Sequence, residues 1–517
     1  MAEQHPDRLK VIVFDDDPTG SQTVHGCPLL LRWDPDSLRR GLAHPSPLLF
    51  LLANSRALDP AAAAARLAEI CQVLRPLLAE AVASGAIDRW MVVSRGDSTL
   101  RGHAPLELEV IAAELGPGLA PQLGSDPWDA CLLVPAFLPG GRTTVEGWHL
   151  LHGEPVHTTA FGRDRLFGYS TSFLPAWLEQ KSGGRIAAEQ VQRITLAELD
   201  AAGADLAGYR ALQRRLAGFG GQVWVAVDAE RPQHLELLGA AVRELTAASA
   251  AERWGRPRRF LFQSAASLLN GLVALPEPAL DRRGLAGLRR RDPGGAPLPG
   301  LVLVGSHVPL ADAQLAELLQ EPDCALVELE VAKLWRLLEG PAPLELLASL
   351  ERSWLAQLQA VLAAGCTPVL ASSRGELVCG SPRERRRLGL ALAALMARLA
   401  AALAPQLGYL ISKGGITSHT LLADGLALAQ VELQGQLLPG LSLVLTPADA
   451  AVPQLPVLTF PGNLGDAGSL RQAWALMAAA AQPSLEDARR GHHHGVDQAE
   501  HGQQGDCGDH HAARRQV

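Results

Sequence analysis

Short apolar runs that end in polar or glycine-rich turns recur along the chain, with longer Ala- and Leu-rich stretches between them. Continuous apolar runs are typical of parallel strands buried on both faces, and the stretches at 60–84 and 311–319 have helical periodicity. This alternation favours an α/β fold built on parallel sheets. The predicted strands cover residues 11–14, 48–52, 90–93, 130–134, 223–227, 301–304, 368–370, 409–411 and 441–445.

The length predicts more than one domain, because 517 residues exceed what a single ordinary hydrophobic core accommodates. Residues 277–300 are rich in Pro, Gly and Arg and have no periodicity, which indicates an interdomain linker or a long surface loop. From residue 483 the chain is polar and rich in His, which is typical of a disordered tail. We therefore predict domains at 1–285 and 286–482, followed by a disordered tail at 483–517.

Composition excludes several classes of protein. With 48% apolar and 19% charged residues the chain can bury large cores, and its formal charge of −8 argues against a nucleic-acid partner. The N-terminus lacks the apolar segment of a signal peptide, and no uninterrupted apolar run reaches the ~18 residues needed to span a membrane. We expect a cytoplasmic protein with no membrane partner.

The seven cysteines are scattered without a CxxC pair, so we expect free thiols at 27, 71, 131, 324, 366, 379 and 507.

Carboxylates follow the first predicted strand. Asp15, Asp16 and Asp17 precede a Pro-Thr-Gly turn, at the strand end where open α/β sheets bind ligands. Such carboxylates accept hydrogen bonds from a polyol, hold Mg²⁺ or act as a base. The alternative is that one or two of them cap the following turn.

A second polar group follows the strand at 90–93. Arg95 and Arg101 flank Asp97, Ser98 and Thr99. The planar guanidinium suits a substrate carboxylate, whereas Asp and Ser suit hydroxyls. The alternative is a structural Asp97–Arg101 ion pair with Ser98 as a helix cap.

The segment 133–174 is too rich in polar and aromatic residues to be a simple connection, and we expect an active-site loop or lid. Arg142 and Thr143, in a Gly-Gly-Arg-Thr-Thr turn, are its strongest candidates for a functional role. A structural role is the simpler interpretation for His157, Arg163 and Asp164.

Glycine-rich turns follow three strands of the second half, at Gly305-Ser306, at 410–420 with Lys413, and at 460–470. None matches GxxxxGK[ST] or GxGxxG, so neither a Walker A loop nor a Rossmann fingerprint is predicted. Each alone is most simply a turn. Three together favour a nucleotide site, in which backbone amides approach phosphate groups.

Taken in order, these motifs resemble those of the four-carbon acid sugar kinase family. The resemblance covers about residues 10–475 and rests on DDDPTGSQT, SRGDSTLRGH, VPAFLPGGRTTVEG, FGRDRLFGYSTSFLP, GSHVPLADAQL, SSRGE, KGGITSH and FPGNLGD. It implies two α/β domains, each with a mostly parallel sheet flanked by helices, and an active site in the cleft between them. The N-terminal domain would bind the acid sugar and the C-terminal domain ATP, with closure of the two domains excluding water.

The implied reaction is the phosphorylation of a hydroxyl of threonate, erythronate or 3-oxo-tetronate, with ATP as the donor and Mg²⁺ as the metal ion. A homodimer is compatible with the sequence. From the logic of phosphoryl transfer we expect Asp97 and Asp16 to be the catalytic residues, which orient the attacking hydroxyl, and we predict no particular metal ligands. The implied acid-sugar pocket consists of Asp16, Asp17, Asp97, Ser98, Arg101 and Arg142. The implied ATP site consists of Ser306, Gly414, Gly415, Ile416, Thr417, Gly462, Asn463 and Gly465.

The sequence departs from the family pattern at Ile416, where many members have an acidic residue after the two glycines. The alternative function is therefore a non-catalytic or regulatory relative that binds the sugar acid or nucleotide but has lost phosphoryl transfer. A third Asp and Pro18 in the first motif leave the choice of tetronate open. An α/β oxidoreductase is disfavoured, because no strand is followed by GxGxxG with an acidic residue about 20 positions further on.

Overall fold

The computed structural model describes residues 7–21, 23–116, 128–339, 344–374 and 381–479. The predicted tail at 483–517, Cys379, Cys507 and the last two residues of SSRGE lie outside the described residues. Within them, Cys27, Cys71, Cys131, Cys324 and Cys366 are free thiols, as expected.

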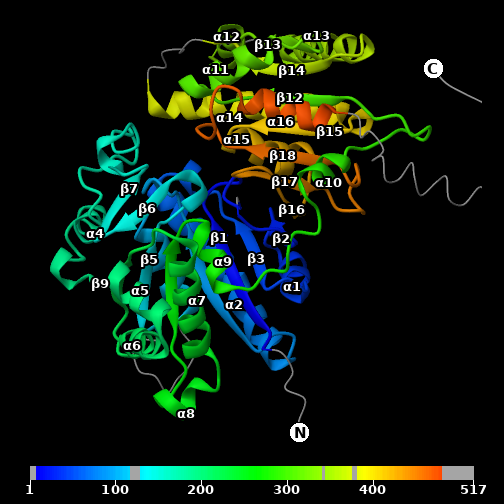
Figure 1. Ribbon diagram of the computed structural model, residues 1–517. Coiled ribbons are helices and arrows are strands. Elements are labelled where there is room, and N and C mark those ends of the chain that lie inside the picture. Colours follow the sequence, from blue (N-terminus) through cyan, green and yellow to red (C-terminus); the bar gives the residue numbers. More distant parts are fainter. Residues whose placement is uncertain (1–6, 22, 117–127, 340–343, 375–380, 480–517) are drawn as a thin grey trace, which may run out of the picture. The chain divides into compact units, whose positions relative to one another are not determined.

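One mixed sheet of 15 strands runs through the described chain, in the order β13-β14-β12-β15-β18-β17-β16-β2-β3-β1-β4-β11-β5-β10-β9 (Figure 1). All the predicted strands are present. The strands are β1 (Leu9–Asp15), β2 (Cys27–Leu30), β3 (Leu48–Leu52), β4 (Arg89–Arg95), β5 (Ala130–Val134), β9 (Gln192–Ile194), β10 (Val223–Val227), β11 (Phe260–Ser264), β12 (Gly300–Val304), β13 (Cys324–Leu329), β14 (Thr367–Ser372), β15 (Tyr409–Lys413), β16 (Gln430–Leu438), β17 (Leu441–Leu445) and β18 (Pro456–Phe460).

Most neighbouring strands are parallel, and the antiparallel pairs lie around β16 and β17. The expectation of a separate sheet for each domain is wrong. β2 pairs with β16, with Leu29 opposite Val431, and this antiparallel pair joins the strands before residue 265 to those after residue 299. A strand with a free edge presents unpaired backbone groups, and pairing β2 with β16 satisfies them.

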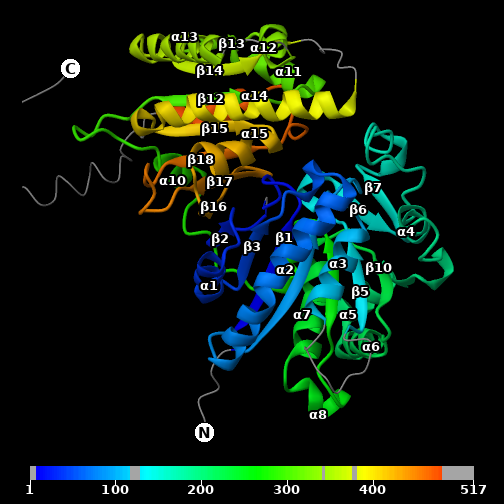
Figure 2. The same ribbon diagram turned by 180° about the vertical axis from the view of Figure 1, so that it is seen from behind.

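Helices cover both faces of the sheet, because successive side chains of each buried strand point to opposite sides. Ile12 and Phe14 pack with α2 (Pro60–Ala83) and α3 (Leu106–Leu115), which are labelled near β1 in Figure 2. Val11 and Val13 belong to the core that includes α7 (Pro232–Thr246) and α9 (Ser267–Leu272). The predicted helices at 60–84 and 311–319 correspond to α2 and to α11 (Pro309–Leu318).

The apolar stretch around Arg398 forms one long helix, α14 (Pro382–Leu403). In the described part of the chain, Glu384–Gln406 is long and apolar enough to cross a membrane by length and composition alone. More than half of its most apolar window, 56%, is buried inside the protein. Arg398 pairs with Glu351 at 2.9 Å on the exposed side, so the apolar residues of this helix serve the core.

The predicted linker at 277–300 contains a short helix, α10 (Arg282–Gly287), whose Leu285 is buried in the core around β12 and β17. The described residues as far as Ala478 form one compact unit. The domain boundary between residues 285 and 286 stays a prediction.

The predicted loop or lid is an ordered insertion with a small antiparallel sheet of β6 (Arg142–Val145), β7 (Trp148–Leu151) and β8 (Glu154–Pro155). Asp228, at the end of β10, accepts hydrogen bonds from Glu146 N at 3.0 Å and from Gly147 N at 2.8 Å. This anchor ties the β6–β7 turn to the main sheet. At the other end of β6, the backbone of Arg142 pairs with that of Phe137, with both N···O distances 3.0 Å, and this pair holds Arg142 in place.

Candidate functional site

The two polar groups of the first half lie together because β1 and β4 are adjacent parallel strands. Asp15, the last residue of β1, is directly opposite Arg95, the last residue of β4. The segments 15–23 and 95–103 therefore leave the sheet at the same edge. Carboxylates of the first segment and arginines of the second therefore lie side by side.

Asp15 and Arg95 form the floor of this site. Arg95 Nη1 lies 3.4 Å from Asp15 Oδ1 and 3.4 Å from Asp16 Oδ1, and all three side chains are buried. Burial raises the pKa of Asp15 to about 7, because the loss of hydration outweighs the attraction of Arg95. A Cβ on Gly20 would overlap Asp15 Oδ1 and Arg95 Nη1, so only glycine fits there. Asp15 consequently has a structural role.

Arg56, which the sequence motifs did not single out, connects the carboxylates. Its guanidinium lies 2.5 Å from Asp17 Oδ2, 3.4 Å from Asp97 Oδ1 and 3.7 Å from Asp16 Oδ2. It belongs to a short turn, η1 (Ser55–Ala57), directly after β3. Arg56 is therefore a third strand-end residue of the same site.

Asp97 and Asp17 are held in the ionised state. Burial alone would raise the pKa of Asp97, but Arg101, Arg56 and the hydrogen bond from Thr99 outweigh it and hold this pKa well below the usual range. The pKa of Asp17 is lowered in the same way: Arg56 and Thr19 overcome the effect of burial. Both carboxylates can thus accept hydrogen bonds at neutral pH.

Arg101 and Arg142 differ in how far their charge is already paired. Arg101 Nε lies 2.7 Å from Asp97 Oδ2 and its Nη1 lies 3.6 Å from Asp164 Oδ2, which brings Asp164 into the site. Arg142 Nη1 donates to Gly140 O at 2.6 Å, and its Nε is buried without a partner. Among the described residues no carboxylate forms an ion pair with Arg142. It is the arginine best able to receive an added carboxylate.

A pocket of about 410 Å³ adjoins these side chains. Its lining combines residues of the first half with Ile416 and other residues of the glycine turns. The lining residues of the two predicted sites are Asp17, Asp97, Ser98, Arg101, Arg142, Gly415, Ile416, Gly462 and Asn463, together with Arg56 and Arg95.

The glycine turns lie together because β12, β15 and β18 are adjacent parallel strands. A Cβ on Gly462 would lie 2.6 Å from Ser306 Oγ, and a Cβ on Gly414 would lie 3.4 Å from Ser306 N. A Cβ on Gly305 would overlap Thr417 Oγ1. The turns therefore pack backbone against side chain, and glycine makes this close approach feasible.

Lys413, at the end of β15, ties two of these turns together. Its Nζ donates to Pro461 O at 3.0 Å and lies 3.9 Å from the centre of the Phe460 ring. Burial lowers the pKa of Lys413 to about 7. The side chain is fully buried, so it supports the glycine turns from inside rather than reaching into the pocket.

Several sequence candidates lie elsewhere. His157 Nδ1 is bonded to Ser172 Oγ at 2.9 Å, Arg163 is exposed, and Thr143 belongs to β6 without lining the pocket. Gly465 is exposed, and a Cβ there would overlap Ser469 Oγ at the start of α16 (Ser469–Ala478).

Two buried rings of the insertion hold the loop that carries Asp97. His149 Nε2 lies 2.7 Å from Ser98 O, and its Nδ1 lies 3.0 Å from Thr144 Oγ1. Tyr169 donates its hydroxyl to Thr99 O at 2.5 Å. Burial lowers the pKa of His149 to about 4, so the neutral ring donates from Nε2 to the carbonyl at neutral pH. The sequence offered no signal for this role.

The described residues contain no group of three His, Cys, Asp or Glu side chains that could hold a metal ion. Asp16, Asp17 and Asp97 are each paired with an arginine. A Mg²⁺ ion would therefore depend on nucleotide phosphates for much of its coordination, which is common for this ion.

Two family models match the chain. A sugar-binding N-terminal domain matches residues 11–272, which is half of the chain. A nucleotide-binding C-terminal domain matches residues 301–470. The first match contains the carboxylates and arginines, and the second contains the three glycine turns.

The chain is 28% identical over 396 residues to the D-threonate kinase of Cupriavidus necator, an alignment that covers 75% of this chain and 80% of that protein. The solved structure of a Salmonella typhimurium protein described as a putative tRNA synthase has a TM-score of 0.61 at 18% identity, covering 90% and 98% of the two chains.

A Haemophilus influenzae protein of the DUF1537 family has a TM-score of 0.53 at 15% identity, covering 90% of this chain and 100% of that chain. At these identities the two structures share the fold alone. With both family models matched in order and the polar residues distributed between them, the chain belongs to the four-carbon acid sugar kinase family.

Proposed function

We propose that this protein transfers the γ-phosphoryl group of ATP to a hydroxyl of a four-carbon sugar acid. The observation that carries the proposal is the single pocket lined both by Arg142 and Asp97 and by the glycine turns at Gly415 and Gly462. We place the reaction in this pocket, between the sugar-binding and nucleotide-binding parts. The D-threonate kinase relative supports a tetronate as the substrate class.

Arg142 is the residue that holds the carboxylate of the sugar acid. Its guanidinium stacks over Phe137, with 5.7 Å from Cζ to the ring centre, and it lacks a carboxylate partner among the described residues. Burial lowers its pKa from the ordinary value, which means that an incoming carboxylate would offset the loss of hydration. Arg101 assists by holding Asp97 in place.

Asp97 orients the attacking hydroxyl. The hydroxyl oxygen forms a bond to the γ-phosphorus, the bond from that phosphorus to the β–γ bridging oxygen breaks, and ADP leaves. The hydroxyl proton passes to Asp97 or to water. An ionised Asp97 beside two guanidiniums is a weak base, but phosphoryl transfer depends mainly on positioning and charge stabilisation.

The glycine turns hold the phosphates of ATP through backbone amides near Gly414, Gly415 and Gly462. Mg²⁺ bound with the nucleotide would neutralise phosphate charge. Ser306 and Thr417 maintain the spacing of these turns, because their side chains fill the space that a Cβ on Gly462 or Gly305 would need.

The test is an ADP-release assay with a panel of four-carbon sugar acids that includes D-threonate. We expect Arg142→Ala to lower kcat/KM by about 100-fold, mainly through KM, because a charge-assisted pair is lost. Asp97→Asn should mainly lower kcat. Arg163→Ala, which changes an exposed arginine of the same insertion, is the matched control. Undiminished turnover in Arg142→Ala would contradict the proposed carboxylate site.

One observation favours a second candidate, a binding protein without phosphoryl transfer. Ile416 lines the pocket with 43% of its surface exposed, so an apolar side chain stands beside the predicted phosphate site. If the chain binds sugar acids without releasing ADP, calorimetric titration with Mg-ATP distinguishes a nucleotide-binding relative from a pure sugar-acid binder. If Ile416→Asp then releases ADP, Ile416 is the cause of the lost phosphoryl transfer.

A further inference from the structure

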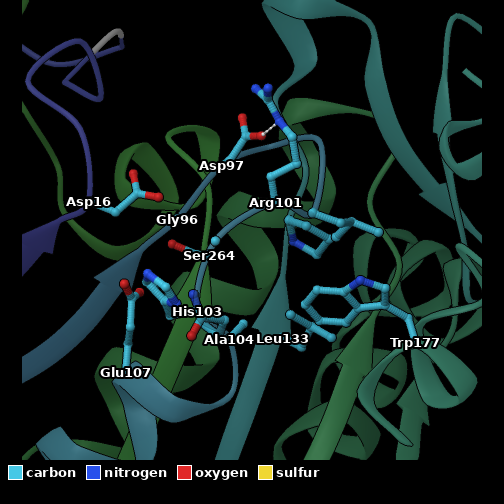
Figure 3. Close-up of a pocket in the computed structure, with 14 residues that line it drawn as sticks. Asp16, Gly96, Asp97, Arg101, His103, Ala104, Glu107, Leu133, Trp177 and Ser264 are labelled. Atoms are coloured by element: carbon cyan, nitrogen blue, oxygen red, sulfur yellow. Dashed lines mark hydrogen bonds and ion pairs between the residues drawn. The ribbon is translucent and has the colours of Figure 1, made fainter. Parts of the chain in front are cut away.

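A second, smaller cavity adjoins the site, and Figure 3 shows the residues that line it. Asp97 and Arg101 line both this cavity and the larger pocket. The small cavity leaves about 20 Å³ for the centre of a water-sized group, which is enough for one water or one hydroxyl. Its described lining includes no residue of the glycine turns, so its occupant lies away from the predicted phosphates.

Three of the side chains that line this cavity each carry a buried polar atom without a hydrogen-bond partner. These atoms are Trp177 Nε1, Gln263 Oε1 and Asp16 Oδ2, on side chains that are 2%, 5% and 2% exposed. Asp16 Oδ2 lies 3.7 Å from Arg56 Nε, which is too far for a hydrogen bond. A buried polar atom without a partner is unfavourable, so three such atoms on the lining residues of one cavity favour a polar occupant.

Other polar side chains of the lining are satisfied within the protein. Glu107 Oε2 accepts from Ser94 Oγ at 3.1 Å, His103 Nε2 lies 3.0 Å from Leu58 O, and Ser264 Oγ donates to Ala265 O at 3.1 Å. The unsatisfied atoms are thus one donor, the indole N–H, one acceptor, the amide oxygen of Gln263, and a carboxyl oxygen of Asp16, whose pKa burial raises well above its usual value. A hydroxyl group, which both accepts and donates, matches this set.

We propose that this cavity is a subsite for one hydroxyl of the sugar acid, other than the hydroxyl that receives the phosphoryl group. The hydroxyl accepts from Trp177 Nε1 and donates to Gln263 Oε1 or Asp16 Oδ2. Leu100 and Leu133, which also line the cavity, enclose the adjacent carbon. The subsite rests on the proposed function, and it makes the enzyme selective for acids that carry a hydroxyl at this position.

The test combines protein variants with ligands that each lack one hydroxyl. The probes are D-threonate and its 2-deoxy, 3-deoxy and 4-deoxy analogues, with binding to the full chain measured by calorimetry. We expect Trp177→Phe, which removes the N–H donor, to weaken D-threonate binding by about 10-fold. One analogue, the one that lacks the hydroxyl in the subsite, should bind wild type and variant with equal affinity.

Gln263→Leu is the second variant, in case Trp177→Phe fails to fold, and it should pick out the same analogue. Trp474→Phe is the matched control, because this buried indole donates to Thr367 Oγ1 at 3.1 Å and does not line the cavity. Equal weakening of all four ligands by Trp177→Phe and Gln263→Leu would overturn the subsite and indicate a trapped water. If wild type binds none of the four, the proposed function fails and the subsite with it.

Discussion

At the scale of single residues, the arginines of the site divide into those that hold the protein's own carboxylates and one that does not. Arg56 contacts three aspartates, Arg95 contacts two, and Arg142 has no ion-pair partner among the described residues. Because buried ion pairs lose hydration, their value lies in fixing geometry rather than in stabilising the fold. Arg56 is consequently the side chain on which the arrangement of the acceptor site depends most.

Replacing Arg56 should disturb both the charge and the geometry of the site. We expect Arg56→Ala to lower kcat/KM by about 100-fold, since it leaves Asp17 and Asp97 without a shared cation. The pKa of Asp97 should rise towards its usual value, because Arg56 is one of the groups that lower it. The acid limb of the pH profile of kcat/KM should therefore move to higher pH.

The matched control is Arg39→Ala, which removes an exposed arginine paired with Asp36 at 3.4 Å. Arg56→Lys should recover part of the loss, because it restores the charge without the planar contacts. An unshifted acid limb in Arg56→Ala would contradict the role assigned to Arg56.

The close packing of the glycine turns gives a second prediction. Gly462→Ala places a Cβ 2.6 Å from Ser306 Oγ, so we expect KM for ATP to rise by about 10-fold. Ser306→Ala combined with Gly462→Ala should recover part of this loss relative to Gly462→Ala alone, because the nearest atom is removed. Steady-state kinetics with ATP as the varied substrate measures the effect.

Gly220→Ala is the control, since no atom lies within 4 Å of a Cβ at that position. If the double variant is no better than Gly462→Ala, the contact between the two turns is not what limits ATP binding.

The site residues of the first half follow apolar runs in the sequence. This position explains which of them sequence reasoning predicted and which it missed. Asp15–Asp17 and Arg95–Arg101 were predicted because each group follows an apolar run and contains several charged residues. Arg56 also follows an apolar run, at residues 48–52, but it is one charge among small residues. A single arginine does not form a recognisable cluster in sequence, although in the folded chain it contacts three carboxylates.

At the scale of elements, the insertion between β5 and β9 supports the neighbouring loop. His149 and Tyr169 bind the carbonyl oxygens of Ser98 and Thr99, and both rings are buried. These two hydrogen bonds therefore fix the backbone of the loop that presents Asp97 and Arg101. The side chains of Asp97, Ser98 and Arg101 line the pocket of about 410 Å³.

This arrangement predicts a pH dependence of stability. The pKa of His149 is about 4 in the folded protein against 6.5 as its ordinary value, so the unfolded chain binds a proton that the folded chain does not. His149 should therefore lower the free energy of unfolding as the pH falls from about 6.5 towards 4, by up to about 3 kcal/mol.

His149→Gln removes the titration and retains a donor and an acceptor. Urea unfolding of wild type and His149→Gln between pH 4.5 and 7.5 measures the difference, because the other titrating groups are common to both. The two stability curves should converge as the pH falls. Parallel curves over this range would contradict the assignment.

Two of the strands that sequence reasoning missed, β16 and β2, have identifiable reasons. β16 alternates half-buried and buried residues, so it lacks the continuous apolar run used to find the other strands. β2 is four residues long and contains Pro28, which is atypical of a central strand. These two strands form the connection between the halves of the sheet, so the single sheet could not be predicted from the apolar runs.

At the scale of the whole molecule, the continuous sheet predicts that the two halves depend on each other. Separate chains for the predicted domains 1–285 and 286–482 would expose the edges of β2 and β16, which are paired in the intact protein. We expect each fragment to melt at a lower temperature than the intact chain and to associate when mixed, because free strand edges pair.

Circular dichroism melts and light scattering on a sizing column measure both effects. The intact chain serves as the reference, and its mass on the column shows whether the protein is a homodimer. Two monomeric fragments that melt within about 2 °C of the intact chain and do not associate would show that the halves are energetically independent.

The β2–β16 pair also has a mechanical consequence. A kinase that closes around its ligands is commonly pictured as two rigid bodies on a flexible tether. Here the two halves share backbone hydrogen bonds across four residue pairs, from Gln430 opposite Leu30 to Leu433 opposite Cys27. Relative movement must therefore twist or bend the sheet elastically. The restoring force of that distortion would favour reopening once the product has formed.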